Sequence, residues 1–174
     1  FSHIIRLDAI GRLQWPVHVA ADEAQRAALA ARFGFLALDL LEADFSMIRE
    51  GTTVMATGSL HARLAQPCTA TSDPVAEEVR EDFTIRFLPE AADAGSEADP
   101  LAEIELDAQE CDTLTYEGER IDMGEAIAET LALAVDPYPR SPKADGFLRE
   151  AGVLTEDQAG PFAALAALKG KLSS

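Results

Sequence analysis

Few residues in this chain have the types and spacing that catalysis or metal binding requires. The sequence contains no Gly-rich phosphate loop, no dinucleotide fingerprint, no nucleophile elbow and no paired-histidine zinc motif. The three histidines are His3, His18 and His61. Each falls in a predicted strand, so we expect them to be side chains on a strand face rather than ligands or general bases.

The cysteines and the paired carboxylates are equally poor candidates for chemistry. Cys68 and Cys111 lie far apart and form no spacing motif, so we expect reduced thiols rather than a disulfide. Cys68 lies in a predicted loop and could be exposed, but no basic residue nearby would lower its pKa. The pairs Glu77-Glu78 and Glu81-Asp82 would need converging oxygens to bind a cation, and a charged strand surface explains them more simply. The sequence therefore predicts no enzyme, no metal and no cofactor.

The charge of the chain is concentrated in its middle third. The 174 residues carry 31 acids and 14 bases, for a net charge of −17. Residues 73–136 hold 20 of these acids and only three bases, so this segment alone accounts for the whole excess. Such a field repels nucleic-acid phosphates and attracts basic proteins. It therefore excludes DNA binding and argues against extensive direct contact with RNA, although the same charge could serve solubility alone.

The segment from Pro89 to Asp112 contains no lysine or arginine, so its negative field is locally unopposed. We expect 89–112 to be a mobile acidic loop, with Ile104 and Leu106 as a possible short edge strand. A partner-binding role is predicted for its nine acids, which are Glu90, Asp93, Glu97, Asp99, Glu103, Glu105, Asp107, Glu110 and Asp112.

The elements that must position these residues begin with two short strands and a helix. Residues 3–7 and 15–20 are predicted strands. Asp22 followed by Gln25 is typical of a capping box at a helix start, and Gly34 is typical of a helix end.

Three long alternating segments follow, and each predicts a strand. In the first, alternation over residues 36–47 slips by one position at Leu41, which indicates a β-bulge. Glu50-Gly51 predicts a hairpin turn, residues 54–64 show the clearest alternation, and residues 75–87 form the third strand. Strands joined by short turns favour an antiparallel meander.

The remainder of the chain predicts helices and an extended linker. Asp122 with Glu125 again suggests a capping box, opening a helix that ends before Pro137. Prolines 139 and 142 predict an extended segment over 137–160, and a short helix follows from Pro161 to Lys169. The predicted fold class is α+β, an antiparallel β-meander with bulged long strands packed by two or three helices, in a single domain spanning 1–174. No stretch has the roughly 18 apolar residues of a membrane span, and no leader pattern opens the chain, so we expect a cytoplasmic protein.

Three ordered motifs give the chain a resemblance to a known family. The first comprises Gln66-Pro67-Cys68 with Thr71, Pro74 and Val75. The second runs from Ile121-Asp122-Met123-Gly124-Glu125 to Asp136-Pro137-Tyr138-Pro139-Arg140. The third is the terminal segment from Pro161 to Lys169. Together with the early helix, they resemble the YceD-like family of large ribosomal RNA subunit accumulation proteins, and the long second motif resembles alphaproteobacterial members in particular.

The resemblance implies a role in the synthesis, processing or stability of large-subunit (23S) ribosomal RNA, without an established catalytic activity. It also implies partnership with a basic ribosomal protein, since family genes tend to lie beside such a gene. Many members carry a CxxC pair in the turn that holds Cys68. Here the second position is Thr71, and one thiol cannot build a four-ligand zinc site, so no metal is carried over.

The sequence therefore predicts a non-enzymatic, cytoplasmic ribosome-biogenesis factor that binds a basic ribosomal protein or a pre-ribosomal particle. Besides the nine acids, residues of the terminal motifs are a second predicted partner surface, namely Tyr138, Arg140, Phe162 and Lys169. The alternative from another class is a small-ligand-binding protein or an enzyme with an unrecognised site.

Overall fold

The computed structural model describes residues 1–90 and 112–153. Among these residues the chain forms a five-stranded sheet, a two-stranded sheet, three α-helices and one 3-10 helix. In chain order the elements are β1 (Ile4–Arg6), η1 (Ile10–Arg12), β2 (Val17–Ala20), α1 (Glu23–Phe33), β3 (Ala37–Glu50), β4 (Thr53–Pro67), β5 (Pro74–Pro89), β6 (Asp112–Tyr116), β7 (Arg120–Asp122), α2 (Met123–Ala134) and α3 (Ala144–Glu150).

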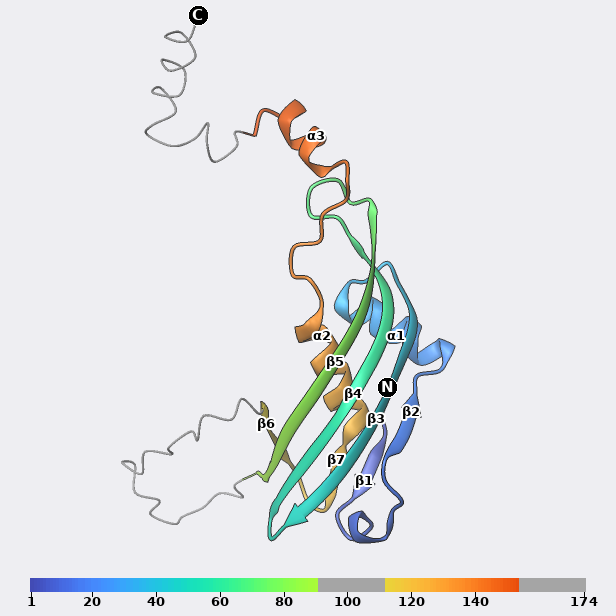
Figure 1. Ribbon diagram of the computed structural model, residues 1–174, viewed down its shortest axis with the longest axis vertical. Coiled ribbons are helices and arrows are strands. Elements are labelled where there is room, and N and C mark those ends of the chain that lie inside the picture. Colours follow the sequence, from blue (N-terminus) through green and yellow to red (C-terminus); the bar gives the residue numbers. More distant parts are fainter. Residues whose placement is uncertain (91–111, 154–174) are drawn as a thin grey trace, which may run out of the picture. The chain divides into compact units, whose positions relative to one another are not determined.

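The large sheet has the strand order β2-β3-β4-β5-β6, so consecutive strands are neighbours (Figure 1). Strands β2 and β3 pair antiparallel, as do β3 and β4. The open sheet with its helices confirms the predicted α+β class. One strand departs from the expected meander, because β6 pairs with β5 in parallel, with Ile85 opposite Asp112 and Pro89 opposite Tyr116.

The predicted bulge is present in β3, but it lies earlier than the sequence indicated. The register with β4 shifts between Leu38 and Leu40, whereas the alternation of apolar residues breaks at Leu41. Leu38 and Leu41 are buried, and Leu40 is only half-buried. Leu40 is apolar although it is not part of the buried core. The apolar alternation therefore continues beyond the actual register shift and breaks only at Leu41.

The helix signals near the start of the chain are confirmed. Asp22 accepts a hydrogen bond from the Gln25 amide at 2.8 Å, and the Gln25 side chain accepts one from the Asp22 amide at 2.9 Å. Gly34 ends α1 in the left-handed conformation, with φ of 75°. The strand predicted at residues 3–7 is present as β1, but its pairing with β7 was not predicted. Helix α3 lies within residues 137–160 and corrects the extended segment that the prolines had indicated there, since both prolines precede its first residue, Ala144.

The chain divides into two compact units. The first comprises Phe1–Gln66 and Ala76–Asp136, and the second comprises Pro67–Val75 and Pro137–Ser174. The expected single domain over 1–174 stays a prediction. The predicted terminal helix from Pro161 to Lys169, Cys111, and the possible edge strand at Ile104 and Leu106 all lie outside the described residues.

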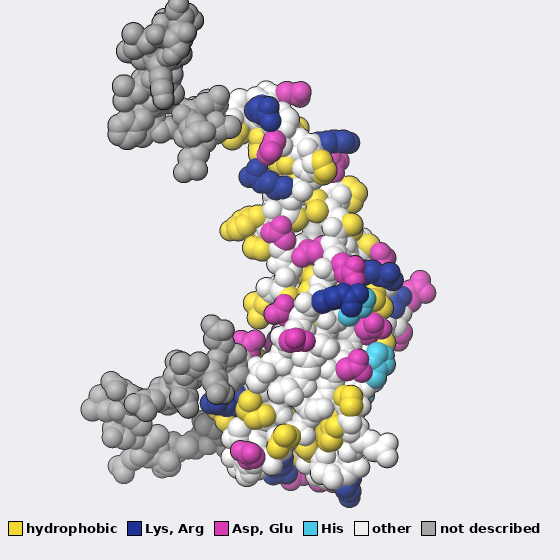
Figure 2. All heavy atoms as spheres, in the orientation of Figure 1, with side chains coloured by type: hydrophobic (Ala, Val, Ile, Leu, Met, Phe, Trp, Pro, Cys, Tyr) yellow, Lys and Arg dark blue, Asp and Glu magenta, His cyan; other side chains and the backbone are white. Residues whose placement is uncertain are grey.

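The buried apolar side chains of the first unit form one core between the large sheet and the helices. Helices α1 and α2 cover the same face of this sheet (Figure 1). The largest fully buried side chains come from both layers, for example Phe45 and Leu60 from the sheet and Ile127 and Leu131 from α2. The opposite face carries charged and neutral polar side chains, with histidines among carboxylates and arginines (Figure 2). In the described part of the chain, no helix is both long and apolar enough to span a bilayer.

Candidate functional site

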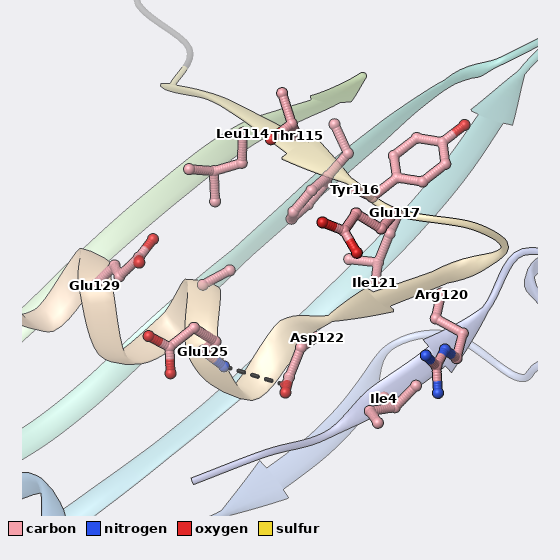
Figure 3. A pocket seen from close by; sticks show the side chains of 12 residues that line it. Ile4, Leu114, Thr115, Tyr116, Glu117, Arg120, Ile121, Asp122, Glu125 and Glu129 are labelled. Atoms are coloured by element: carbon pink, nitrogen blue, oxygen red, sulfur yellow. Dashed lines mark hydrogen bonds between the residues drawn. The ribbon is translucent and has the colours of Figure 1, made fainter. Parts of the chain in front are cut away.

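The first unit contains a groove of about 490 Å³ between helix α2 and strands β1, β6 and β7 (Figure 3). Its apolar lining comes from both layers of the fold. Ile121 and Ala126 are buried, Leu114 is half-buried, and Ile4 on the edge of the small sheet is 53% exposed. The groove therefore has an apolar floor, part of which is accessible to solvent.

The rim of this groove is predominantly acidic. Glu117, Asp122, Glu125 and Glu129 line it, and Arg120 is the basic side chain among its described lining residues. In Figure 3, Glu125 and Glu129 project from α2, and Glu117 lies on the opposite side of the groove. Arg120 lies next to Ile4, away from these three acids.

A like-charged pair adds to the negative field at one side of the groove. Glu90 directly follows β5, and its amide donates to the carbonyl of Tyr116 at 2.9 Å. This bond brings the Glu90 carboxyl beside Glu117. The side-chain hydrogen bond and the charge of Glu117 together raise the pKa of Glu90 above its ordinary value.

Asp122 fixes the start of α2 and ties it to the beginning of the chain. Its carboxylate accepts from the Ser2 hydroxyl at 2.6 Å, the His3 amide at 2.9 Å and the Glu125 amide at 3.2 Å. Burial by itself would raise the pKa of Asp122, but these hydrogen bonds outweigh it and the pKa lies below its ordinary value. The carboxylate is therefore a structural cap in the groove wall.

The second predicted capping box is only half formed, which corrects the sequence-based expectation. Asp122 caps the Glu125 amide, but the Glu125 carboxylate accepts two hydrogen bonds from the Arg32 guanidinium, at 2.6 and 2.9 Å. A bidentate charged pair of this kind competes successfully with a single bond to a backbone amide. Glu125 is thus largely neutralised by helix α1.

A second, smaller hollow of about 210 Å³ follows the same helix toward its end. It is lined by Thr130 and Leu133 of α2, and by Glu81, Asp82 and Asp112 of the neighbouring strands. Acidic side chains therefore line both the groove and the smaller hollow beside α2.

The structure places four of the predicted partner-binding residues. Glu90 lies beside the groove and Asp112 in the smaller hollow, both in the first unit. Tyr138, which is 74% exposed, and Arg140 belong to the second unit. The other nine lie outside the described residues, namely Asp93, Glu97, Asp99, Glu103, Glu105, Asp107, Glu110, Phe162 and Lys169.

Sequence reasoning missed Glu117 and Glu129 as site residues. They lie outside the continuous acidic run, on elements whose meeting depends on the tertiary fold. The available signal was the charge of the wider segment 73–136, which includes both residues.

Cys68 differs from the exposed loop thiol that was expected, because it is 3% exposed in the second unit. The Ser141 amide donates to its Sγ at 3.3 Å. This bond and one from the Thr71 side chain lower the pKa of Cys68 to about 6, although burial opposes the shift. The sequence argument failed because it considered only basic neighbours, whereas hydrogen bonds to a thiolate have the same effect.

The same cluster joins two of the sequence motifs. The Thr69 amide donates to the carbonyl of Pro139 at 2.9 Å, and the Thr71 and Ser141 hydroxyls lie 3.2 Å apart. Residues about seventy positions apart are thereby held together within the second unit.

The histidines and paired carboxylates behave largely as surface residues. His61 lies between Glu42 at 3.2 Å and Glu78 at 3.0 Å on the sheet face opposite the helices, and His18 contacts Asp44 at 3.1 Å. His3, by contrast, precedes β1 rather than lying within a strand. Over residues 1–90 and 112–153, no group of three potential ligand side chains converges to hold a metal ion.

Glu77 has a structural role that its position in a charged pair did not reveal. Its carboxylate accepts from the Gln66 side chain at 2.9 Å and from the Asp136 amide at 3.0 Å. Gln66 also donates to the carbonyl of Asp136 at 2.9 Å. The end of α2 is thereby attached to the long hairpin within the first unit.

Comparison with known proteins gives one match. Residues 56–169, well over half of the chain, match the family model described as "Large ribosomal RNA subunit accumulation protein YceD". No curated protein and no solved structure matches the chain.

Proposed function

We propose a binding function for this chain, which belongs to the YceD family of large ribosomal RNA subunit accumulation proteins. The family description connects the chain with accumulation of large-subunit ribosomal RNA. Our proposal is that the chain acts in the cytoplasm without catalysis, by binding a basic ribosomal protein or a pre-ribosomal particle. Its effect on the RNA is then indirect.

The observation that carries this proposal is the acidic rim around an apolar groove. RNA binding relies on cations that displace counterions from phosphates, whereas Glu117 and Glu129 line the groove and Glu90 lies beside Glu117. Basic ribosomal proteins have the complementary charge. Electrostatic complementarity of this kind raises association rates and selects partners.

The first experiment tests the role in RNA accumulation. The gene is deleted, and mature large-subunit RNA and subunit profiles are measured with and without a plasmid copy. We expect reduced RNA and large subunits, restored by the plasmid copy. Unchanged RNA and subunit profiles after deletion would refute the function altogether.

The second experiment tests the mode of binding. A pull-down from lysate at low and moderate salt compares the wild type with a variant in which all nine acids from Glu90 to Asp112 are amides. We expect weaker recovery of ribosomal proteins by the variant and at higher salt, because steering by exposed charges is screened. Equal recovery by both proteins at both salts would instead favour the second predicted surface, formed by Tyr138, Arg140, Phe162 and Lys169.

One observation supports a second candidate function. A volume of about 490 Å³ falls in the range of small-molecule sites, so the groove could hold a small ligand. A thermal-shift panel of metabolites and divalent ions tests this, since a ligand at about 100 times its Kd adds about 2.7 kcal/mol. A reproducible shift with one compound that Glu129→Gln abolishes would favour the ligand-binding function.

A further inference from the structure

We propose that the groove beside α2 seats an apolar side chain of a basic protein segment, whose neighbouring lysine or arginine is received by Glu117 and Glu90. This inference rests on the proposed function and specifies its site and the chemistry of its partner. The occupant is a peptide segment of another protein that combines apolar and cationic residues.

The apolar part of the argument is the accessible floor of the groove. Ile4 is half-exposed on β1 of the two-stranded sheet, where it lies opposite Asp122 of β7. Leu114 on β6 also lines the groove and is only half-buried. Covering these side chains would remove apolar surface from water, which is worth roughly 25 cal/mol per Å².

The electrostatic part is the like-charged pair formed by Glu90 and Glu117, which the bond from the Glu90 amide to the Tyr116 carbonyl brings together. Each is exposed, and each carboxyl is the other's electrostatic neighbour, which raises the pKa of Glu90. Two neighbouring like charges repel, and a cation placed between them would add two attractions that offset this repulsion. A lysine or arginine from a partner is such a cation.

The other charges of the rim give the partner a preferred orientation. Glu125 is already engaged by Arg32, so it contributes little attraction to a further cation. Glu129 projects from α2, whereas Arg120 lies on the side of Ile4 (Figure 3). Cationic residues of the partner therefore face Glu117, Glu90 and Glu129, and its apolar side chain lies toward Ile4 and Arg120.

The test uses a fluorescent peptide of roughly 14 residues, long enough for marginal helicity, composed of leucine and lysine with one apolar face. Two matched peptides replace every lysine by glutamate or every leucine by serine. We expect the Leu/Lys peptide to bind the full-length protein at low salt and both matched peptides to bind at least tenfold more weakly, which corresponds to about 1.4 kcal/mol.

Three protein variants locate the binding. In Glu90→Gln/Glu117→Gln the like-charged pair is neutralised, and in Ile4→Ser the exposed apolar side chain is removed. The control, Asp39→Asn/Glu50→Gln, neutralises two exposed acids elsewhere in the first unit. We expect roughly tenfold weaker binding for each groove variant and an unchanged Kd for the control. Equal binding by all three variants would overturn the inference.

An NMR titration of the wild-type protein keeps the test independent of how well any variant folds. We expect the amide signals of Leu114, Glu117 and Ala126 to shift as the Leu/Lys peptide is added. Shifts confined to other residues would overturn the inference. So would a dimer in solution that Ile4→Ser converts to a monomer, because the groove would then be occupied by a second copy.

The failure of this inference is distinguishable from that of the proposed function. If Glu90→Gln/Glu117→Gln still restores large-subunit RNA in the deletion strain while the peptide assay shows no groove binding, the groove is excluded and the function stands. If deletion of the gene leaves the amount of large-subunit RNA unchanged, the proposed function is refuted, whether or not the peptide binds to the groove.

Discussion

The two compact units are stabilised by different kinds of interaction. In the first unit, apolar side chains such as Ile127, Leu131 and Phe45 are completely buried between sheet and helices. In the described part of the second unit, hydrogen bonds join the hairpin tip to the segment after α2, with Cys68 and Ser141 at their centre. The first unit is therefore stabilised mainly by its apolar core, and the described part of the second unit is held together by polar contacts.

This difference shows that the family motifs serve two structural purposes. The motif from Ile121 to Glu125 belongs to the first unit, where it starts α2 and attaches the beginning of the chain. Cys68 and Thr71 of the other motif belong to the second unit and bond to the segment containing Pro139 and Ser141. Motif residues thus support the fold, and three of them, Ile121, Asp122 and Glu125, also line the acidic groove.

The largest expected effect comes from opening a cavity in the apolar core. Ile127→Ala should lower the free energy of unfolding by about 2–5 kcal/mol, because a completely buried aliphatic side chain is removed. Urea denaturation followed by circular dichroism measures this. Leu133→Ala on the same helix is the control, since Leu133 is exposed and its loss should change stability by less than about 0.5 kcal/mol. Equal effects would contradict the assignment of the core.

The second effect contrasts one helical glycine in each unit. An added Cβ at Gly124 in α2 would lie 2.7 Å from the His3 nitrogen and 2.9 Å from the Ser2 carbonyl carbon, whereas nothing lies within 4 Å at Gly146 in α3. Gly124→Ala should therefore destabilise by about 1–3 kcal/mol, since the contacted atoms are backbone. Gly146→Ala should be neutral or stabilising by up to about 1 kcal/mol. Thermal melts compare them, and a stabilising Gly124→Ala would be inconsistent with the close approach.

Breaking the polar assembly of the second unit should have a local effect. Cys68→Ala removes the acceptor of the Ser141 amide, and we expect that amide to exchange roughly tenfold faster with solvent deuterium. Amides of β3 in the first unit should keep their exchange rates. A uniform rise in exchange throughout the chain would show instead that the two units unfold together.

The thiol itself gives the pH dependence of this assembly. Since the pKa of Cys68 is lowered to about 6, the thiolate contributes stability that is fully present above its unfolded value of about 8.5. That contribution is lost as pH falls through about 6. Thiolate absorbance at ultraviolet wavelengths, measured in a Cys111→Ser variant, should titrate with a midpoint near 6. A midpoint near 8.5 would contradict the hydrogen-bonded thiolate.

The smallest effect is expected at the exposed carboxyl pair. Because Glu117 raises the pKa of Glu90, the protonated form is favoured in the folded state. The associated stability is present below the unfolded value of about 4.3 and is lost as pH rises through the folded pKa. The wild type should therefore lose stability relative to Glu90→Gln as pH rises from 4 to 7 in urea titrations. A difference that is constant with pH would exclude the coupling, and Glu50→Gln serves as the control.

The sequence predicted those parts of the fold that depend on local signals. Alternation in residues 54–64, the capping box at Asp22 and the N-cap at Asp122 are consequences of chain geometry within a few residues, and the structure confirms them. The other half of the box predicted at Asp122 is absent because Glu125 bonds to Arg32, which is distant in sequence. The family was also predicted from its motifs, and the family match bears this out.

Features that depend on distant parts of the chain were not predicted. The parallel pairing of β6, the β1–β7 sheet and the burial of Cys68 all require partners far away in sequence. The groove is of the same kind, because Ile4, Leu114 and Glu129 come together only when the sheets and α2 pack. The periodicity of a sequence does not indicate which distant residues come into contact in the fold.

The parallel pairing of β5 with β6 has a consequence for how the protein could be divided. Parallel neighbours cannot be joined by a tight turn, and here the sequence between Pro89 and Asp112 joins the two strands. Cutting it would leave two polypeptides that interlock, since β1 of the first pairs with β7 of the second and β6 of the second pairs with β5 of the first. The chain is thus suited to reconstitution from two separately expressed fragments. Recovery of the folded structure would then show that the two fragments had associated.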